Sequence, residues 1–393
     1  TDGSEQVLHE QADEDLAEII NFDLYDGKID MVIPQVGDVT PVGFTKAGKT
    51  LAKLIAKQGQ HVSIDRLLWA GNGDFVTATL SVDAQSYSYH IFDLNLGTDT
   101  KISDFYFKTK HTDALVPTET VQITARDGMK LNALLLRPKG VDGAAPMVLE
   151  VHGGPAGQVK WEYHHFRQFL VNRGYAVLAV NFRGSSGLGK IYQAAGYGEY
   201  GRKMQDDLVD ATLWAIDQGI ADPKAIAING SSYGGYASAM GLVRDPDLFK
   251  AGIIEHAMLD VAYQSQYPPH SWGLYLGQWE RYFGDINSPG DMEKMHQRSP
   301  INLVAQMQAA ALMVAGKRDP VVGFEQTERF ITKAKDLGKN IDSLIFENEG
   351  HGIDKWQSRI RHARRVEDFL AEHLGGRSGN WDWIEPIAAY LDN

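Results

Sequence analysis

The stretch INGSSYGGYAS, Ile228 to Ser238, follows the apolar run Ala225–Ile228 and packs two adjacent serines between glycines. The apolar run has the length of a buried strand, and the residues after the glycines favour a helix. Gly230, Ser232 and Gly234 form the pattern G-x-S-x-G, which can hold a serine hydroxyl at the tip of a sharp turn. The stretch therefore predicts either a nucleophile on a strained turn or an ordinary glycine-rich connection.

Apolar strands alternate with helical patterns on both sides of this turn. The strand segments are 147–152, 176–181, 225–229, 251–256, 311–316 and 342–347, preceded by a two-strand lead-in at 121–140. Near-continuous apolar strands separated by helices indicate a mostly parallel sheet with helices on both faces. We predict an α/β fold, in which functional residues gather at the carboxyl ends of the strands.

Two more candidate residues each follow a separate strand: Asp319 comes after 311–316, and His351 after 342–347. The chain order Ser, Asp, His is that of the α/β-hydrolases. A serine hydroxyl needs a base to take its proton, which His351 would supply, and Asp319 would orient and stabilise that histidine. Considered alone, Asp319 could be explained as a helix cap, and His351 as an ordinary histidine in a loop. Together with Ser232, which is more central in the motif than Ser231, they favour catalysis.

An acyl-transfer site also needs hydrogen-bond donors for the oxyanion. The segment EVHGGPAG, residues 150–157, follows the first strong strand, so its glycines lie at the same edge of the sheet. We predict that the backbone N–H groups of Gly154 and Tyr233 are these donors.

The segment 267–285, between the serine and the aspartate, is strongly aromatic. We predict that this segment, the aromatic insert, forms an apolar substrate pocket lined by Trp272, Tyr275, Trp279 and Tyr282. The alternative is that these rings only pack against one another within the insert. The segment 181–190 lacks the spacing of a phosphate-binding loop, so we expect a structural loop there. Adjacent carboxylates at Asp206 and Asp207 favour a cap or a salt bridge.

The first part of the chain has a different pattern. Between about residues 20 and 107, short alternating segments with turn residues indicate antiparallel strands, the segment 48–57 among them. A hairpin turn is expected at Asn72-Gly73-Asp74. The acidic segment 9–20 is predicted to be a helix or a loose tail. We predict a β region over 1–115, resembling the last two blades of a propeller, and a catalytic domain over 116–393.

Composition limits the classes of function. The net charge of −13 over 393 residues argues against nucleic-acid binding. With no cysteine, the chain has no disulfide, thiol nucleophile or cysteine metal site. We expect no metal or cofactor and no membrane span, since no apolar run approaches about 18 residues. The first residue is Thr1, so a removed targeting peptide, the compartment and the oligomeric state, a homo-oligomer included, stay open.

Several motifs taken together resemble the prolyl oligopeptidase family of serine hydrolases, in its acylaminoacyl-peptidase and dipeptidyl-peptidase-like branch. They are VLEVHGGP, NFRGSSGLG, INGSSYGGY, RSPI, GKRDPVV and ENEGHG, within about 120–375. The resemblance implies an α/β-hydrolase domain after a substrate-filtering propeller, with Ser232 as nucleophile, Asp319 as triad acid and His351 as base. Two blades cannot close a propeller, so we expect a fragment of a longer precursor or a member with a reduced cap.

The resemblance leaves two enzymatic functions open. A serine peptidase cleaving short peptides or acyl-peptides is favoured. A carboxylesterase acting on hydrophobic acyl esters with the same triad is the alternative, because Val321 stands where branch members often carry an arginine that binds a peptide carbonyl. A non-catalytic binding protein is disfavoured because no triad residue is missing. Activity should rise through about pH 6–7, as a histidine base loses its proton.

Overall fold

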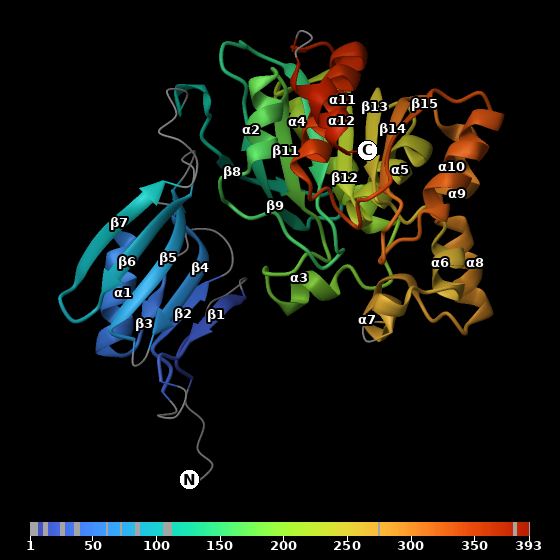
Figure 1. The fold of residues 1–393 in the computed structure, drawn as a ribbon. Coiled ribbons are helices and arrows are strands. Elements are labelled where there is room, and N and C mark those ends of the chain that lie inside the picture. The colour runs from blue at the N-terminus through green and yellow to red at the C-terminus, as the bar shows by residue number, and fades with distance from the viewer. Residues whose placement is uncertain are drawn as a thin grey trace. The chain divides into compact units, whose positions relative to one another are not determined.

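The computed structural model describes residues 7–10, 15–23, 28–34, 40–59, 62–70, 73–82, 87–104, 112–273, 276–379 and 383–392. The chain divides into two compact units, coloured from blue to red along the chain in Figure 1. The first contains Thr1–Thr118, Lys160–His164 and Ser186–Ala194, and the second contains the rest.

An eight-stranded sheet forms the centre of the second unit, with strand order β15-β14-β13-β12-β10-β11-β9-β8. Its strands are β8 (Glu119–Thr124), β9 (Lys130–Leu136), β10 (Ala145–Val151), β11 (Ala176–Asn181), β12 (Ala221–Ser231), β13 (Ala251–Glu255), β14 (Ala310–Gly316) and β15 (Ile341–Phe346). Strands β10 to β15 run parallel, and β9 pairs antiparallel with both β11 and β8. The central strands are buried along their length, because helices cover both faces and leave no solvated side.

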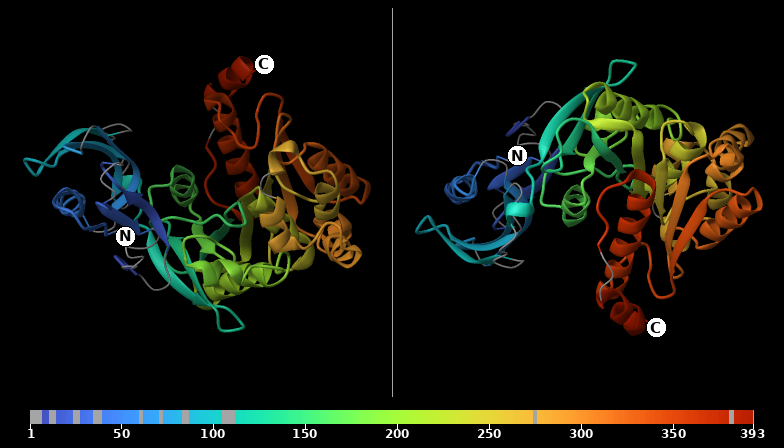
Figure 2. Two further views of the ribbon diagram at one scale, coloured as in Figure 1. Left: turned by 90° about the horizontal axis from the view of Figure 1, so that it is seen from below. Right: turned by 90° about the horizontal axis from the view of Figure 1, so that it is seen from above.

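Helices lie on both faces of this sheet, as the two views in Figure 2 show. The main ones are α2 (His165–Asn172), α4 (Lys203–Asp217), α5 (Tyr233–Arg244), α10 (Glu325–Asp336) and α11 (Trp356–Leu374). A ring stack between Phe166 and His362 joins α2 to α11 on one face, while α5 is buried along nearly its whole length against the other. The prediction of an α/β-hydrolase fold is confirmed.

Shorter elements complete the second unit. They are α6 (Val261–Gln266), η2 (His270–Trp272), α7 (Leu276–Phe283), α8 (Pro289–Gln297), α9 (Pro300–Leu303), η3 (Val304–Gln306) and α12 (Ile384–Asp392). In α12 and just before it, Trp383, Ile384 and Tyr390 are more than half exposed. No helix in the described part of the chain is long and apolar enough to cross a membrane.

The first unit is built from two antiparallel sheets and a helix around a separate apolar core. One sheet contains β1 (Leu16–Ile20), β2 (Met31–Pro34) and β3 (Val42–Gly43). The other contains β4 (Val62–Ala70), β5 (Phe75–Val82), β6 (Ser88–Asp93) and β7 (Thr98–Asp104). The helix α1 (Lys46–Ala56) packs against them, and η1 (Thr112–Ala114) and α3 (Lys190–Ala194) belong to the same unit.

Two local predictions for this unit are wrong. The segment 48–57 was expected to be a strand, but α1 covers most of it. The Thr45 side chain accepts a hydrogen bond from the Gly48 N–H and caps the helix, and Leu51, Leu54 and Ile55 are buried on one helical face. The segment 9–20 was expected to be helix or tail, but β1 occupies its end. The predicted hairpin is present as the β4–β5 pair, although Asn72 lies outside the described residues.

Candidate active site

Four neighbouring strands of the large sheet deliver the candidate catalytic loops to one edge. A row of backbone hydrogen bonds continues the sheet beyond the strand ends. It runs from Ser232 N–H to the Glu255 carbonyl (2.9 Å), from His256 N–H to Val314 (2.9 Å), from Lys317 N–H to Phe346 (2.9 Å) and from Arg318 N–H to Glu349 (3.0 Å). These bonds fix the backbone on which Ser232, Asp319 and His351 are carried.

Ser232 occupies a strained backbone position between β12 and α5. Its φ is 59° and its ψ is −119°, a conformation that non-glycine residues rarely adopt. The turn is close to the end of β10, because a Cβ on Gly234 would lie 2.1 Å from the carbonyl oxygen of Val151. Only glycine fits there. Such strain at a sharp strand-to-helix turn is typical of a nucleophile and costs about 1–3 kcal/mol.

Asp319 and His351 form a hydrogen-bonded pair. The Nδ1 of His351 lies 2.7 Å from Oδ2 of Asp319, and we assign the hydrogen to Nδ1 because a carboxylate only accepts. The other oxygen, Oδ1, accepts from the N–H groups of Val321 (2.8 Å) and Val322 (2.9 Å). The Asp319 side chain is 3% exposed and that of His351 is 22% exposed. The carboxylate is thus buried with both of its oxygens hydrogen-bonded, and the Nδ1 contact leaves Nε2 of the imidazole to act as a base.

Among the described residues, Asp319 and His351 are the hydrogen-bonded pair of the predicted triad, and Ser232 is held through its backbone. The distance between the serine hydroxyl and the histidine commonly shortens only when substrate binds.

The HGGP segment, His152 to Pro155, passes beside the nucleophile turn. A Cβ on Gly153 would lie 3.5 Å from the Cβ of Ser232. Gly154 has a φ of 126°, which other residues rarely adopt, and a Cβ there would lie 2.3 Å from the nitrogen of Gly157. The segment therefore needs its glycines to turn tightly and to pass this close to Ser232.

The His152 side chain holds this segment in place through contacts of both ring nitrogens. Its Nδ1 lies 2.7 Å from the Gly153 carbonyl and its Nε2 lies 2.8 Å from the Ser185 hydroxyl. The ring stacks on Phe182 with centroids 4.3 Å apart. Burial lowers the pKa of His152 to about 4, so the ring is neutral at pH 7. The sequence shows a histidine next to the glycines, but it does not reveal that this histidine bonds to Ser185, 33 residues later.

The aromatic insert contacts the loop that follows Asp319. Trp272 is buried, stacks on Trp279 with centroids 4.9 Å apart, and donates from Nε1 to the carbonyl of Val321 (3.1 Å). Tyr282 is also buried, and its hydroxyl donates to the carbonyl of Gly184 (3.1 Å). Trp279 is half-buried, and Tyr275 lies outside the described residues. The insert therefore contacts the loop that carries Asp319, the acid loop, and no local sequence signal predicts this contact.

An ion-pair network around the buried side chains of Arg183 and Asp207 holds the loop after β11. Arg183 donates to Asp207 through Nε (2.8 Å) and Nη2 (2.6 Å), and to Asp127 through Nη1 (2.8 Å) and Nη2 (2.9 Å). Hydrogen bonds from Arg183 hold the pKa of Asp127 well below its usual range. Asp207 therefore forms the salt bridge that the sequence favoured.

No group of three or more His, Asp or Glu side chains able to hold a metal ion occurs among the residues that the structure describes.

The comparisons with known proteins agree on one family. The model of the prolyl oligopeptidase family matches residues 161–377. Dipeptidyl aminopeptidase BIII of Pseudoxanthomonas mexicana is 34% identical over 339 residues, covering 81% of this chain and 49% of that protein. Dipeptidyl peptidase family member 6 of Caenorhabditis elegans is 32% identical, covering 59% of this chain and 32% of that protein.

A solved Mycobacterium tuberculosis puromycin-hydrolyzing peptidase superposes with a TM-score of 0.79 at 24% identity, over 91% of this chain and 54% of that one. The chain thus spans about half the length, or less, of the relatives it matches. The matched region contains Ser232, Asp319 and His351. The chain belongs to the prolyl oligopeptidase family.

Proposed function

We propose that this chain is the catalytic part of a serine peptidase that hydrolyses short peptides or acyl-peptides through an acyl-enzyme. The observation that carries the proposal is the buried Asp319–His351 pair at the sheet edge where Ser232 sits on a strained turn. Membership of the prolyl oligopeptidase family supports it. The pair and the turn are the parts that activation of a serine hydroxyl requires.

The proposed reaction has two halves. His351 Nε2 takes the proton of the Ser232 hydroxyl as its oxygen attacks the scissile carbonyl carbon. The N–H groups of Gly154 and Tyr233 donate to the resulting oxyanion, each worth roughly 3 kcal/mol of barrier. His351 then gives its proton to the leaving amine, and the acyl group stays on Ser232. A water molecule attacks this ester as His351 takes its proton, and His351 then returns the proton to the Ser232 oxygen as the acid leaves.

The substrate pocket belongs to the same proposal. Trp279 is half-buried on the insert and would present its ring to a hydrophobic side chain or acyl group, with Trp272 and Tyr282 supporting the insert and Tyr275 completing the set. Residues 1–115 would restrict substrates to short peptides, and 116–393 would carry out the chemistry. Activity that does not fall as peptide length increases would contradict the filter.

A carboxylesterase is the second candidate. The observation that favours it is Val321. Its backbone N–H donates to Asp319 and its carbonyl accepts from Trp272, while its aliphatic side chain offers no charge to a peptide carbonyl. The discriminating experiment compares kcat/KM for an amide and an ester with the same hydrophobic acyl group, with Ser232→Ala as the control. Amide cleavage that the variant loses supports the peptidase. Ester cleavage with negligible amide cleavage supports the esterase.

The proposal includes a homo-oligomer. The exposed side chains of Trp383, Ile384 and Tyr390 at the C-terminal helix support it, because large apolar side chains gathered on one element often mark an interface. Light scattering tests it, and a monomeric mass at micromolar concentration would contradict it.

A further inference from the structure

The residue after β13, His256, stands out within the second unit. Its backbone φ is 47°, a left-handed conformation that is uncommon outside glycine. Its side chain is buried, with 2% of the residue exposed. Its backbone N–H is part of the hydrogen-bond row at the sheet edge, bonded to Val314. A strained backbone and a buried ring at this edge call for a functional explanation rather than an ordinary place in the core.

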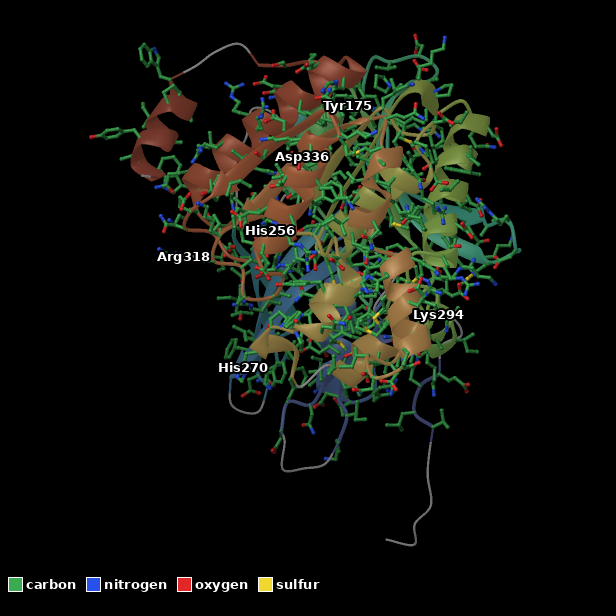
Figure 3. The ribbon with its side chains drawn as sticks, turned by 90° about the vertical axis from the view of Figure 1, so that its right-hand side faces the viewer. Tyr175, His256, His270, Lys294, Arg318 and Asp336 are labelled. Carbon is green, nitrogen blue, oxygen red and sulfur yellow. The ribbon has the colours of Figure 1, made fainter. Side chains whose placement is uncertain are left out.

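The ring of His256 contacts the ring of His351. The two centroids are 5.8 Å apart and the planes stand at 72°, an edge-to-face arrangement. Within the described part of the chain, neither ring nitrogen of His256 has a hydrogen-bond partner. The ring is therefore held by packing. Figure 3 labels His256 together with Arg318, which precedes Asp319 on the loop after the neighbouring strand β14.

We propose that His256 is a positioning residue for the general base. Its ring blocks rotation of the His351 imidazole, so that Nδ1 stays on Asp319 and Nε2 remains available as the base for Ser232. This inference rests on the proposed function of His351. Asp319 fixes one edge of the imidazole through a hydrogen bond, and the His256 ring restrains the side chain from a second direction.

The electrostatic surroundings of His256 fit this role. The titratable groups around it are Glu255 on β13, Asp319 after β14, His351 after β15 and His362 on α11. The carboxylate of Glu255 pairs with His362, with 3.2 Å between its Oε1 and Nε2 of the histidine. Burial lowers the pKa of His256, so the ring is neutral when the enzyme works. A neutral ring is required, because a second cation beside His351 would oppose its protonation during the reaction.

The test compares two matched substitutions that flank the same strand, β13. His256→Leu and Phe249→Leu each replace a buried ring by an aliphatic chain, one after the carboxyl end of β13 and one before its amino end. A third variant, His256→Phe, restores a ring that cannot titrate. For each we would measure kcat and KM on an amide substrate, the rate of Ser232 labelling by a fluorophosphonate, and the melting temperature.

We expect His256→Leu to lower kcat and the labelling rate by about tenfold, the upper range for an aromatic pair, with KM within about twofold. Phe249→Leu should leave kcat within about twofold even where it lowers the melting temperature, and His256→Phe should recover most of the lost rate. Equal kcat in the two leucine variants, or no recovery with phenylalanine, would overturn the inference. A wild-type protein that the probe does not label would instead overturn the proposed function.

Discussion

At the scale of single residues, the site depends on groups whose protonation is set by where they are buried. His152 is neutral in the folded protein because burial lowers its pKa from 6.5 to about 4, whereas in the unfolded chain it takes up a proton near pH 6.5. The folded state therefore binds fewer protons than the unfolded state between those values. It follows that this residue stabilises the fold above about pH 6.5 and that the contribution is lost as the pH falls toward 4.

We predict that His152→Gln makes stability less sensitive to acid. Between pH 7 and pH 4.5 the wild type should lose about 2 kcal/mol more unfolding free energy than the variant, allowing for the partial exposure of this side chain. Urea unfolding at the two pH values measures the difference. Parallel losses in both proteins would show that His152 is not the group that titrates.

At the scale of elements, the aromatic insert supports the loop that carries Asp319, in addition to its proposed role in a substrate pocket. Trp272 donates a hydrogen bond to the carbonyl of Val321, and the backbone N–H of Val321 in turn donates to Asp319. Aromatic composition alone predicted a pocket, because sequence shows which rings are near one another along the chain but not which carbonyl an indole N–H reaches 49 residues away. The nucleophile turn was easier to predict, since its glycines, serine and flanking strand are contiguous.

We predict that Trp272→Phe, which keeps a ring but removes the indole N–H, lowers kcat about fivefold through a looser Asp319 loop, as expected for one hydrogen bond of about 1 kcal/mol. The matched control is Tyr175→Phe, which also removes one bond from an aromatic side chain to a carbonyl, that of Gly375. Steady-state kinetics on one amide substrate compares them. If both variants keep the wild-type kcat, the contact with the acid loop has no catalytic role.

At the scale of the whole molecule, the large sheet was predictable because its strands are apolar along their length and separated by helical patterns. The helix α1 was not, because an apolar residue every three or four positions in a short segment can also be read as alternation. The ion pair between Glu255 on β13 and His362 on α11 was also hidden, since its partners are 107 residues apart. That pair joins the sheet to the longest helix.

The Glu255–His362 pair makes stability depend on pH in the opposite sense to His152. Against the effect of burial, Glu255 raises the pKa of His362. The contribution of His362 is therefore full below about pH 6.5 and is lost as the pH rises through its raised folded value. We predict that His362→Phe destabilises the protein more at pH 6 than at pH 9, as measured by urea unfolding. An equal effect at both pH values would contradict this.

The most direct test of the central claim is to identify the nucleophile by intact-protein mass spectrometry after reaction with a fluorophosphonate. The wild type, Ser231→Ala and Ser232→Ala form a matched set, since the two serines are adjacent and only Ser232 has the strained φ. The account predicts one adduct on the wild type and on Ser231→Ala, and none on Ser232→Ala. An adduct that persists in Ser232→Ala, or that disappears in Ser231→Ala, would contradict it.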